Sequence, residues 1–251
     1  MKTQLDYLVL ETTRRCNMKC AHCLRGPAQN KDMPYEVIDN ALKDVSYIGC
    51  ITFGGGEPTL NVEAIEYTLR VCIERGINVM NFYVVTNGKQ VTKRFIYAMM
   101  SWYFYTTECG GDPEYSGVAM SQDMFHEKVP SKNVIRLSSL SFFKDTEKRT
   151  DWNKIPVINE GNALFLSDVP KREKVRSDYV TADWINDELV LNDTILYVTV
   201  DGDVFLDCDL SYESQANIIE EESSLYVGNV KETFSNILLK YAPEKDLEET
   251  A

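Results

Sequence analysis

The 251-residue sequence has no apolar run near the roughly 18 residues that a membrane-spanning helix needs. Its N-terminus also lacks the basic segment, apolar core and small-residue cleavage site of a secretory signal. Basic residues are outnumbered, with 26 Lys and Arg against 39 Asp and Glu, and the net charge of −13 repels nucleic-acid phosphates and anionic lipids. We therefore expect a cytoplasmic protein with neither a nucleic-acid partner nor a membrane partner.

The seven cysteines are an odd number in a chain too large to need disulfide staples. Three of them, Cys16, Cys20 and Cys23, form a C-x3-C-x2-C pattern directly after an apolar stretch. A closed zinc site takes four ligands, typically as two separated pairs, and the sequence offers no second pair. Three thiolates on a short loop can instead hold three irons of a cubane cluster and leave the fourth iron open to chemistry.

The first half of the chain alternates strand and helix signals. The expected elements are a strand over 5–11, a helix over 34–45, a strand over 49–53, a helix over 62–75 between an Asn61 cap and Gly76, a strand over 79–85, and a helix carrying Val91, Phe95, Ile96 and Met99. Three strand–loop–helix units in series predict a parallel sheet with right-handed crossovers. The loops after such strands gather at one sheet edge, where ligands bind.

After residue 100 the alternation weakens. Residues 117–123, 134–142 and 155–166 predict further strands, but the helices between them are short or absent. We therefore expect an α/β protein with an incomplete (β/α)6-type TIM barrel over residues 1–180.

Residues 181–251 predict a small hairpin-plus-helix appendage. Its hairpin joins 195–200 to 203–208 through Asp201-Gly202, a pair typical of type I′ turns. A helix over 230–241 follows, with Asn229 as its N-cap and Glu232 completing a capping box. The acidic segments 218–224 and 243–250 are interpreted as a solvated loop and tail.

The segment "FGGGEPTL", Phe53 to Leu60, ends the second predicted strand. Gly54, Gly55 and Gly56 lack a Cβ, so the backbone can come close to a ligand, and Pro58 fixes the turn. Free backbone groups there suit an amino-acid moiety, with Glu57 held nearby. A glycine-rich turn without a ligand is the alternative.

Taken together, the two motifs resemble those of the radical S-adenosylmethionine (radical SAM) superfamily. "CNMKCAHC" is similar to its cluster motif, and "GGEP" matches the segment that contacts the methionyl amino group. The resemblance implies that Cys16, Cys20 and Cys23 bind a [4Fe-4S] cluster whose open iron is chelated by S-adenosylmethionine. It also implies reductive cleavage to a 5′-deoxyadenosyl radical that abstracts a substrate hydrogen, an external flavodoxin- or ferredoxin-like reductant, and anaerobic conditions.

Further positions match the family more loosely. His22 stands where the family often has an aromatic residue beside the adenine, and Thr86 and Asn87 belong to a "TNG" turn that the family often has near the cofactor. Ser121 and Asp123 in "SQD" stand where the family places polar side chains toward the ribose or substrate, and His126, three residues on, is a candidate catalytic residue. Asn159–Ala163 resembles a glycine turn near the adenine. A helix-capping turn is an equal alternative for "TNG", and a structural role is an alternative for both histidines.

The tail resembles the twitch or SPASM appendage of peptide-modifying radical enzymes, which implies a peptide or peptide-like substrate. There, the hairpin cysteine joins several others around an auxiliary cluster, whereas Cys208 is the only cysteine after Cys109. We therefore expect the appendage to keep its shape without its cluster, although a cluster that uses Cys109 and Cys208 with non-cysteine ligands stays open. The same two thiols are candidate hydrogen-atom donors, and Cys109 is the candidate catalytic residue.

Two other functions stay open. One is an activase that installs a glycyl radical on a partner enzyme. The other is a non-catalytic iron–sulfur redox sensor, although a sensor needs no cofactor cradle such as "GGEP".

Overall fold

The computed structural model describes residues 1–144, 156–174 and 179–244. The strands are β1 (Thr3–Thr13), β2 (Val45–Gly55), β3 (Asn78–Thr86), β4 (Gly117–Met120), β5 (Phe143–Lys144), β6 (Val157–Ile158), β7 (Lys171–Arg172), β8 (Thr181–Ile185), β9 (Glu188–Val198), β10 (Asp203–Phe205) and β11 (Tyr226–Asn229). The helices are α1 (Tyr35–Ala41), α2 (Val62–Arg75), α3 (Lys93–Glu108), α4 (Ser131–Ser138), α5 (Tyr212–Glu220) and α6 (Phe234–Leu238), with 3-10 turns η1 (Pro58–Leu60), η3 (Gly161–Phe165) and η4 (Leu239–Tyr241).

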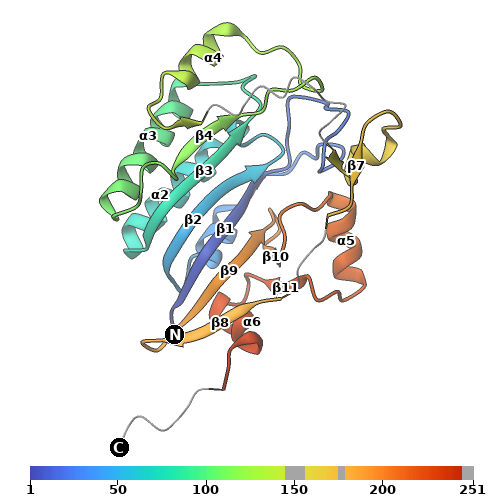
Figure 1. Ribbon diagram of the computed structural model, residues 1–251. Helices are drawn as coiled ribbons and strands as arrows, with labels where there is room; N and C mark the ends of the chain where they lie inside the picture. Colours follow the sequence, from blue (N-terminus) through green and yellow to red (C-terminus); the bar gives the residue numbers. More distant parts are fainter. Residues whose placement is uncertain (145–155, 175–178, 245–251) are drawn as a thin grey trace, which may run out of the picture.

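One large sheet organises the molecule (Figure 1), with neighbouring strands in the order β11-β10-β9-β1-β2-β3-β4-β5 and β8 also paired to β9. The pairs from β9 through β1 to β5 are all parallel. The pairs made by β8, β10 and β11 are antiparallel. The expected incomplete α/β barrel with a C-terminal antiparallel region is therefore confirmed.

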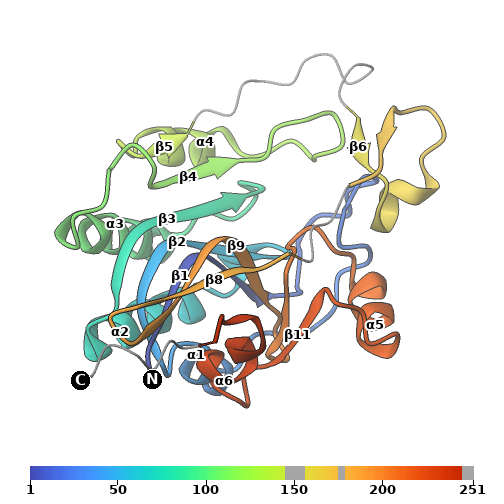
Figure 2. The same cartoon turned by 60° about the horizontal axis from the view of Figure 1, so that its bottom comes forward.

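The alternation of strands and helices in the first half is confirmed as well. The side chain of Asn61 accepts a hydrogen bond from the Ala64 N–H at the start of α2, and Gly76 ends this helix with a φ of 63°. Helices α1, α2 and α3 lie along the outside of the curved sheet (Figure 2). Leu8, Phe53 and Phe82 are fully buried in the core between these layers.

Strand β9 takes a central place in the sheet although it comes late in the sequence. Its residues Leu189–Val198 pair in parallel with Thr3–Leu10 of β1. The C-terminal strands are thus a direct extension of the parallel sheet, and one edge of β1 is covered by a strand whose first residue, Glu188, is 184 residues from Gln4.

Two strand predictions in the middle of the chain are wrong. Residues 134–142 lie mostly in α4, because Val134, Leu137 and Leu140 recur every three residues and pack together on the core. In the described part of 155–166, only two residues form a strand, β6, which pairs with β7 outside the large sheet, and η3 follows. Val45 was likewise expected in a helix, but it begins β2 and pairs with Thr3.

The expected hairpin forms, but its turn is not type I′. Thr199 N–H donates to the Asp203 carbonyl and Gly202 N–H donates to the Thr199 carbonyl. Gly202 has a φ of 84°, whereas Asp201 is not among the residues with positive φ. A type I′ turn needs positive φ at both central residues, so this connection is the three-residue loop with a glycine bulge.

The elements after the hairpin also differ from expectation. Asn229 still belongs to β11, opposite Asp203, so the last helix begins later, at its N-cap Thr233, and no capping box forms. The acidic segment 218–224 is partly helical because α5 extends to Glu220. Most of the predicted acidic tail, residues 245–250, lies outside the described residues. In the described part of the chain, no helix has both the length and the apolarity to cross a bilayer.

Candidate active site

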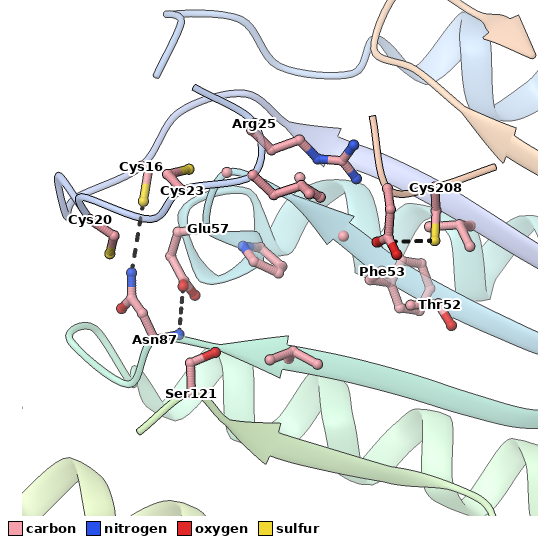
Figure 3. A pocket seen from close by; sticks show the side chains of 18 of the residues that line it. Cys16, Cys20, Cys23, Arg25, Thr52, Phe53, Glu57, Asn87, Ser121 and Cys208 are labelled. Carbon is pink, nitrogen blue, oxygen red and sulfur yellow. Dashed lines mark hydrogen bonds between the residues drawn. The ribbon is translucent and has the colours of Figure 1, made fainter. Parts of the chain in front are cut away.

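A cavity of about 740 Å³ opens where strands β1 to β4 end (Figure 3). The three clustered cysteines, the glycine segment, Asn87 and the "SQD" residues all line it. The topology explains this convergence, since parallel neighbouring strands bring the loops after their carboxyl ends to one edge. The C-terminal part of the chain completes the wall with Ile195, Cys208 and Asp209.

The cysteine loop follows β1 and presents three free, half-buried thiols. Burial raises the pKa of Cys16, and the negative charges of Glu57, Cys23 and Cys20 raise it further, against a hydrogen bond from the Met18 backbone. Burial also raises the pKa of Cys23, although backbone hydrogen bonds from Arg25 and Gly26 oppose this. The loop thus gathers three thiols whose deprotonation is mutually unfavourable unless a cation shares them.

The glycine segment holds the cysteine loop in place. A Cβ on Gly55 would lie 2.1 Å from the Thr13 carbonyl oxygen, and one on Gly56 would lie 2.3 Å from that of Arg15. Gly56 N–H donates to Thr13, and Glu57 N–H donates to Arg15. The expected close backbone approach therefore involves the cysteine loop itself, and two of the N–H groups that we expected to be free for a ligand are occupied. Gly54 is different, because its Cβ would have 3.7 Å of space.

Glu57 is almost fully buried and ties the end of β2 to the end of β3. Its Oε1 accepts from the Thr86 hydroxyl and the Thr59 hydroxyl, both at 2.7 Å, and its Oε2 accepts from the Asn87 N–H at 2.8 Å. Burial raises the pKa of Glu57, although these hydrogen bonds oppose the shift. The carboxylate is thus committed to the protein, and Thr86 faces it and does not line the cavity.

Asn87 connects the hydrogen bonds of Glu57 to the cysteine loop. Its Nδ2 donates to Asn17 Oδ1 at 2.8 Å and lies 3.9 Å from Cys16 Sγ. Lys89 Nζ reaches the Asn17 carbonyl oxygen at 2.8 Å. The "TNG" turn therefore contacts the cysteine loop directly, and Asn87 is one of the expected site residues that the fold brings to it.

The "SQD" loop places Ser121 and Asp123 in the cavity wall beside both histidines. Asp123 Oδ1 lies 2.6 Å from His126 Nδ1, and Oδ2 lies 3.4 Å from His22 Nε2. The His22 ring stacks on Phe125 with 4.6 Å between centroids. Burial lowers the pKa of His126, but the hydrogen bonds and charges of Asp123 and Cys20 outweigh it and raise the pKa to about 9.

The "NEGNA" segment, Asn159–Ala163, also meets the cysteine loop. Asn162 donates its backbone N–H to the Cys23 carbonyl at 2.9 Å and its side-chain Nδ2 to the Cys20 carbonyl at 3.1 Å. Gly161 has a φ of 57°, and a Cβ there would lie 2.2 Å from the Leu24 carbonyl oxygen. The segment thus contacts the loop at Cys20–Leu24, whereas the glycine segment contacts it at Thr13 and Arg15.

Cys109 is not part of this site. It is the C-cap of α3, beside Tyr105 and Cys72, at the end of the sheet where the parallel strands begin. Cys208, in contrast, lines the cavity next to Asp209. The fold therefore separates the two thiols that we considered as a shared cluster or as alternative hydrogen donors.

Sequence reasoning missed Arg25 and Tyr197, which stack against each other at the C-terminal side of the cavity. Arg25 stands two residues after Cys23 and points into the cavity wall. The signal that could have found it was its place in the cysteine loop, but its partners come from β9 and the segment after β10, which the sequence places far away.

Solved structures with similar overall arrangements include anSMEcpe with bound AdoMet and Cp18Cys peptide, at 12% identity and a TM-score of 0.47 over 94% of this chain and 80% of that one. Another is SuiB of Streptococcus suis bound to precursor peptide SuiA, at 17% identity and a TM-score of 0.34 over 49% of this chain and 25% of that one. These low scores decide nothing about the function of this chain.

Two curated proteins are similar in sequence. The uncharacterized protein MJ0907 of Methanocaldococcus jannaschii is 30% identical over 94 residues, 36% of this chain and 33% of that protein. The putative protein YfkA of Bacillus subtilis is 32% identical over 82 residues, 30% of this chain and 22% of that protein. The chain thus matches a third or less of the length of these relatives.

The family model for the Radical SAM superfamily matches residues 10–102, which include the end of β1, the cysteine loop, the glycine segment and the "TNG" turn. These are the elements that the geometry brings together around the three thiols. Over residues 10–102, the chain therefore matches the radical SAM superfamily.

Proposed function

We propose that this radical SAM enzyme removes a hydrogen atom from a peptide or peptide-like substrate. When bound, a [4Fe-4S] cluster and S-adenosylmethionine supply a 5′-deoxyadenosyl radical, the chemistry that the family implies. The observation that carries the proposal is a cavity that joins the three cysteines to a second hollow on the open face of the sheet.

The residues present fit this cofactor pair. Cys16, Cys20 and Cys23 are free thiols on one loop, and they would hold three irons of the cluster. The glycine segment lines the same cavity, whose 740 Å³ lies within the range of about 300–1,000 Å³ that small-molecule sites have. Asn87, held by Glu57, orients the loop at Cys16.

The second hollow, of about 560 Å³, supports a chain-like substrate. It shares Tyr7, Thr52 and Tyr83 with the cysteine cavity. Strand register places Tyr7 beside Cys50, and Cys50 beside Asn81, on this inner face. Hydroxyl and amide groups in such a row can both donate to and accept from the N–H and C=O groups that a peptide repeats along its length.

The activase and sensor alternatives remain distinguishable. A redox sensor needs no site for a substrate, so the second hollow favours an enzyme. Deleting residues 190–251 cannot test the activase alternative, because this deletion removes most of β9 from the middle of the sheet. Substitution of a residue that lines the second hollow, such as Tyr83→Leu, tests the activase alternative without removing a strand.

The first experiment measures 5′-deoxyadenosine by mass spectrometry after anaerobic reconstitution with iron and sulfide, addition of S-adenosylmethionine and dithionite. Wild type should form it, and Cys16→Ala should not, because one cluster ligand is lost. Cys109→Ala is the matched control and should retain formation, since this thiol lies at the far end of the sheet. Absence of product from a protein with a full cluster would contradict the enzyme assignment.

A further inference from the structure

Arg25 extends from the cysteine loop into the cavity on the side of Cys208 (Figure 3). Its guanidinium carbon lies 4.7 Å from the centroid of the Tyr197 ring. Nη1 donates a hydrogen bond to the Leu210 carbonyl. The cation is thus seated on an aromatic face, an arrangement that orients the planar guanidinium.

This seat is rigid. Tyr197 is fully buried, and its hydroxyl donates to Glu11 Oε1 at 2.6 Å. The backbone carbonyl of Arg25 accepts from the Tyr212 N–H at 3.1 Å. Both ends of the side chain are therefore fixed by the C-terminal part of the chain before any ligand arrives.

The nearby carboxylates already have other partners. Glu11 Oε2 accepts from Arg14 Nε at 2.8 Å. Asp207 and Asp209 are both bonded to Lys174 Nζ, at 2.7 and 2.6 Å. Among the described residues, the positive charges of Arg14 and Lys174 are matched by these groups, and Arg25 forms no ion pair.

Most donors of Arg25 are unused. A guanidinium carries five N–H groups, and the Leu210 carbonyl takes one of them. A guanidinium is not deprotonated in proteins, so the group carries a positive charge. A purely structural arginine would fill its donors with carbonyls or a carboxylate, because an unpaired charge in a protein wall is unfavourable.

We propose that Arg25 binds a carboxylate of the substrate, so that the substrate class is narrowed to molecules with an acidic group. This inference rests on the proposed function. The guanidinium fork matches a carboxylate with two parallel hydrogen bonds. In Figure 3 the Arg25 side chain extends toward Cys208 and away from Cys16 and Cys20, so this anion subsite lies on the Cys208 side of the cavity.

The test compares binding of three tripeptide pools to the anaerobic holoenzyme with S-adenosylmethionine and no reductant. The pools are Ac-Xaa-Glu-Xaa-NH2, Ac-Xaa-Gln-Xaa-NH2 and Ac-Xaa-Gln-Xaa-OH, and retention is measured by equilibrium dialysis with mass spectrometry. Wild type should retain one or both carboxylate-bearing pools about tenfold or more over the amidated glutamine pool. The glutamate pool and the free-acid pool distinguish a side-chain from a C-terminal carboxylate.

Arg25→Gln should abolish this preference, and Arg25→Lys should restore part of it because the charge returns without the fork. Arg70 is an exposed arginine stacked on Tyr67, and Arg70→Gln should leave the retention of all three pools unchanged. Equal retention of all pools by wild type, retention of none, or a preference that survives Arg25→Gln would overturn the proposal. So would a loss of S-adenosylmethionine affinity in Arg25→Gln, which would assign the guanidinium to the cofactor's carboxylate.

Formation of 5′-deoxyadenosine without peptide is measured in the same preparations. If wild type and Arg25→Gln both form it while the pools show no carboxylate preference, the anion subsite is wrong and the radical enzyme stands. If neither forms it, the proposed function fails as well.

Discussion

The buried carboxylate of Glu57 links the two strand ends on which the cysteine loop rests, so its charge matters more for the loop than for a ligand. In Glu57→Gln, the amide nitrogen replaces an acceptor, and one of the donors from Thr86, Thr59 or Asn87 loses its partner. We expect a loss of about 1–3 kcal/mol in the free energy of unfolding, together with less iron bound per chain. Urea unfolding and iron analysis measure both.

The control for that substitution is Glu74→Gln, which removes an exposed partner of Arg70. It should change the free energy of unfolding by less than about 0.5 kcal/mol. Equal stability of Glu57→Gln and wild type would contradict the role of this carboxylate in joining the ends of β2 and β3.

The pair of Asp123 and His126 gives a pH dependence that can be read residue by residue, because the chain has only 2 histidines. The pKa of His126 is raised to about 9, so its stabilising effect is complete below about pH 6.5 and is lost as the pH rises through about 9. The pKa of Asp123 is lowered, after burial is outweighed by His126 and His22, so its effect is lost as the pH falls below about 4. This pair should therefore stabilise the metal-free protein most between about pH 4 and about pH 6.5.

Histidine NMR titration of the metal-free protein measures this directly. One histidine should titrate near pH 9, and Asp123→Asn should return it toward about 6.5. His22→Gln identifies which signal belongs to which ring. Two wild-type titrations near the ordinary value would show that the ion pair does not form.

At the scale of elements, the contact between the glycine segment and the cysteine loop decides whether the thiols converge. In Gly56→Ala, a Cβ 2.3 Å from the Arg15 carbonyl oxygen must displace the loop. We expect a destabilisation of about 1–3 kcal/mol and a marked loss of bound iron. Gly54→Ala is the matched control, since its Cβ meets no atom closer than 3.7 Å. Similar iron content in the two variants would contradict the steric role of Gly56.

The elements that the sequence predicts correctly are those with local causes. Helix α2 has its own cap at Asn61 and its own stop at Gly76, and the cysteine and glycine motifs are contiguous in sequence. The errors fall where the cause is distant. In residues 134–142, the spacing of Val134, Leu137 and Leu140 covers only about two helical turns, too short to tell a helix from a strand without the core that these residues contact. Arg25 likewise shows its role only in the fold, where Tyr197 and Leu210 lie beside it.

At the scale of the whole molecule, one sheet crosses the expected division at residue 180, and that division stays a prediction. A chain ending at residue 180 loses β9 and leaves the polar groups of β1 unpaired from Thr3 to Leu10. We expect this truncated chain to be aggregated or unfolded by circular dichroism and sedimentation. A chain ending at residue 230 keeps β9, β10 and β11 and should stay folded, with lower stability because Phe234 and Leu238 are lost from the core. A folded monomer from the 1–180 chain would show instead that the barrel is independent.

The late position of β9 beside β1 also orders events during synthesis. Strand β1 ends at residue 13 and β9 begins at residue 188, an interval of about 10–35 s at typical rates of translation. Throughout that time β1 has one unpaired edge, and the wall that carries Tyr197 and Cys208 does not exist. The nascent chain therefore presents its three cysteines in a loop that is open to iron and sulfide before β9 and the segment after β10 complete the cavity around them.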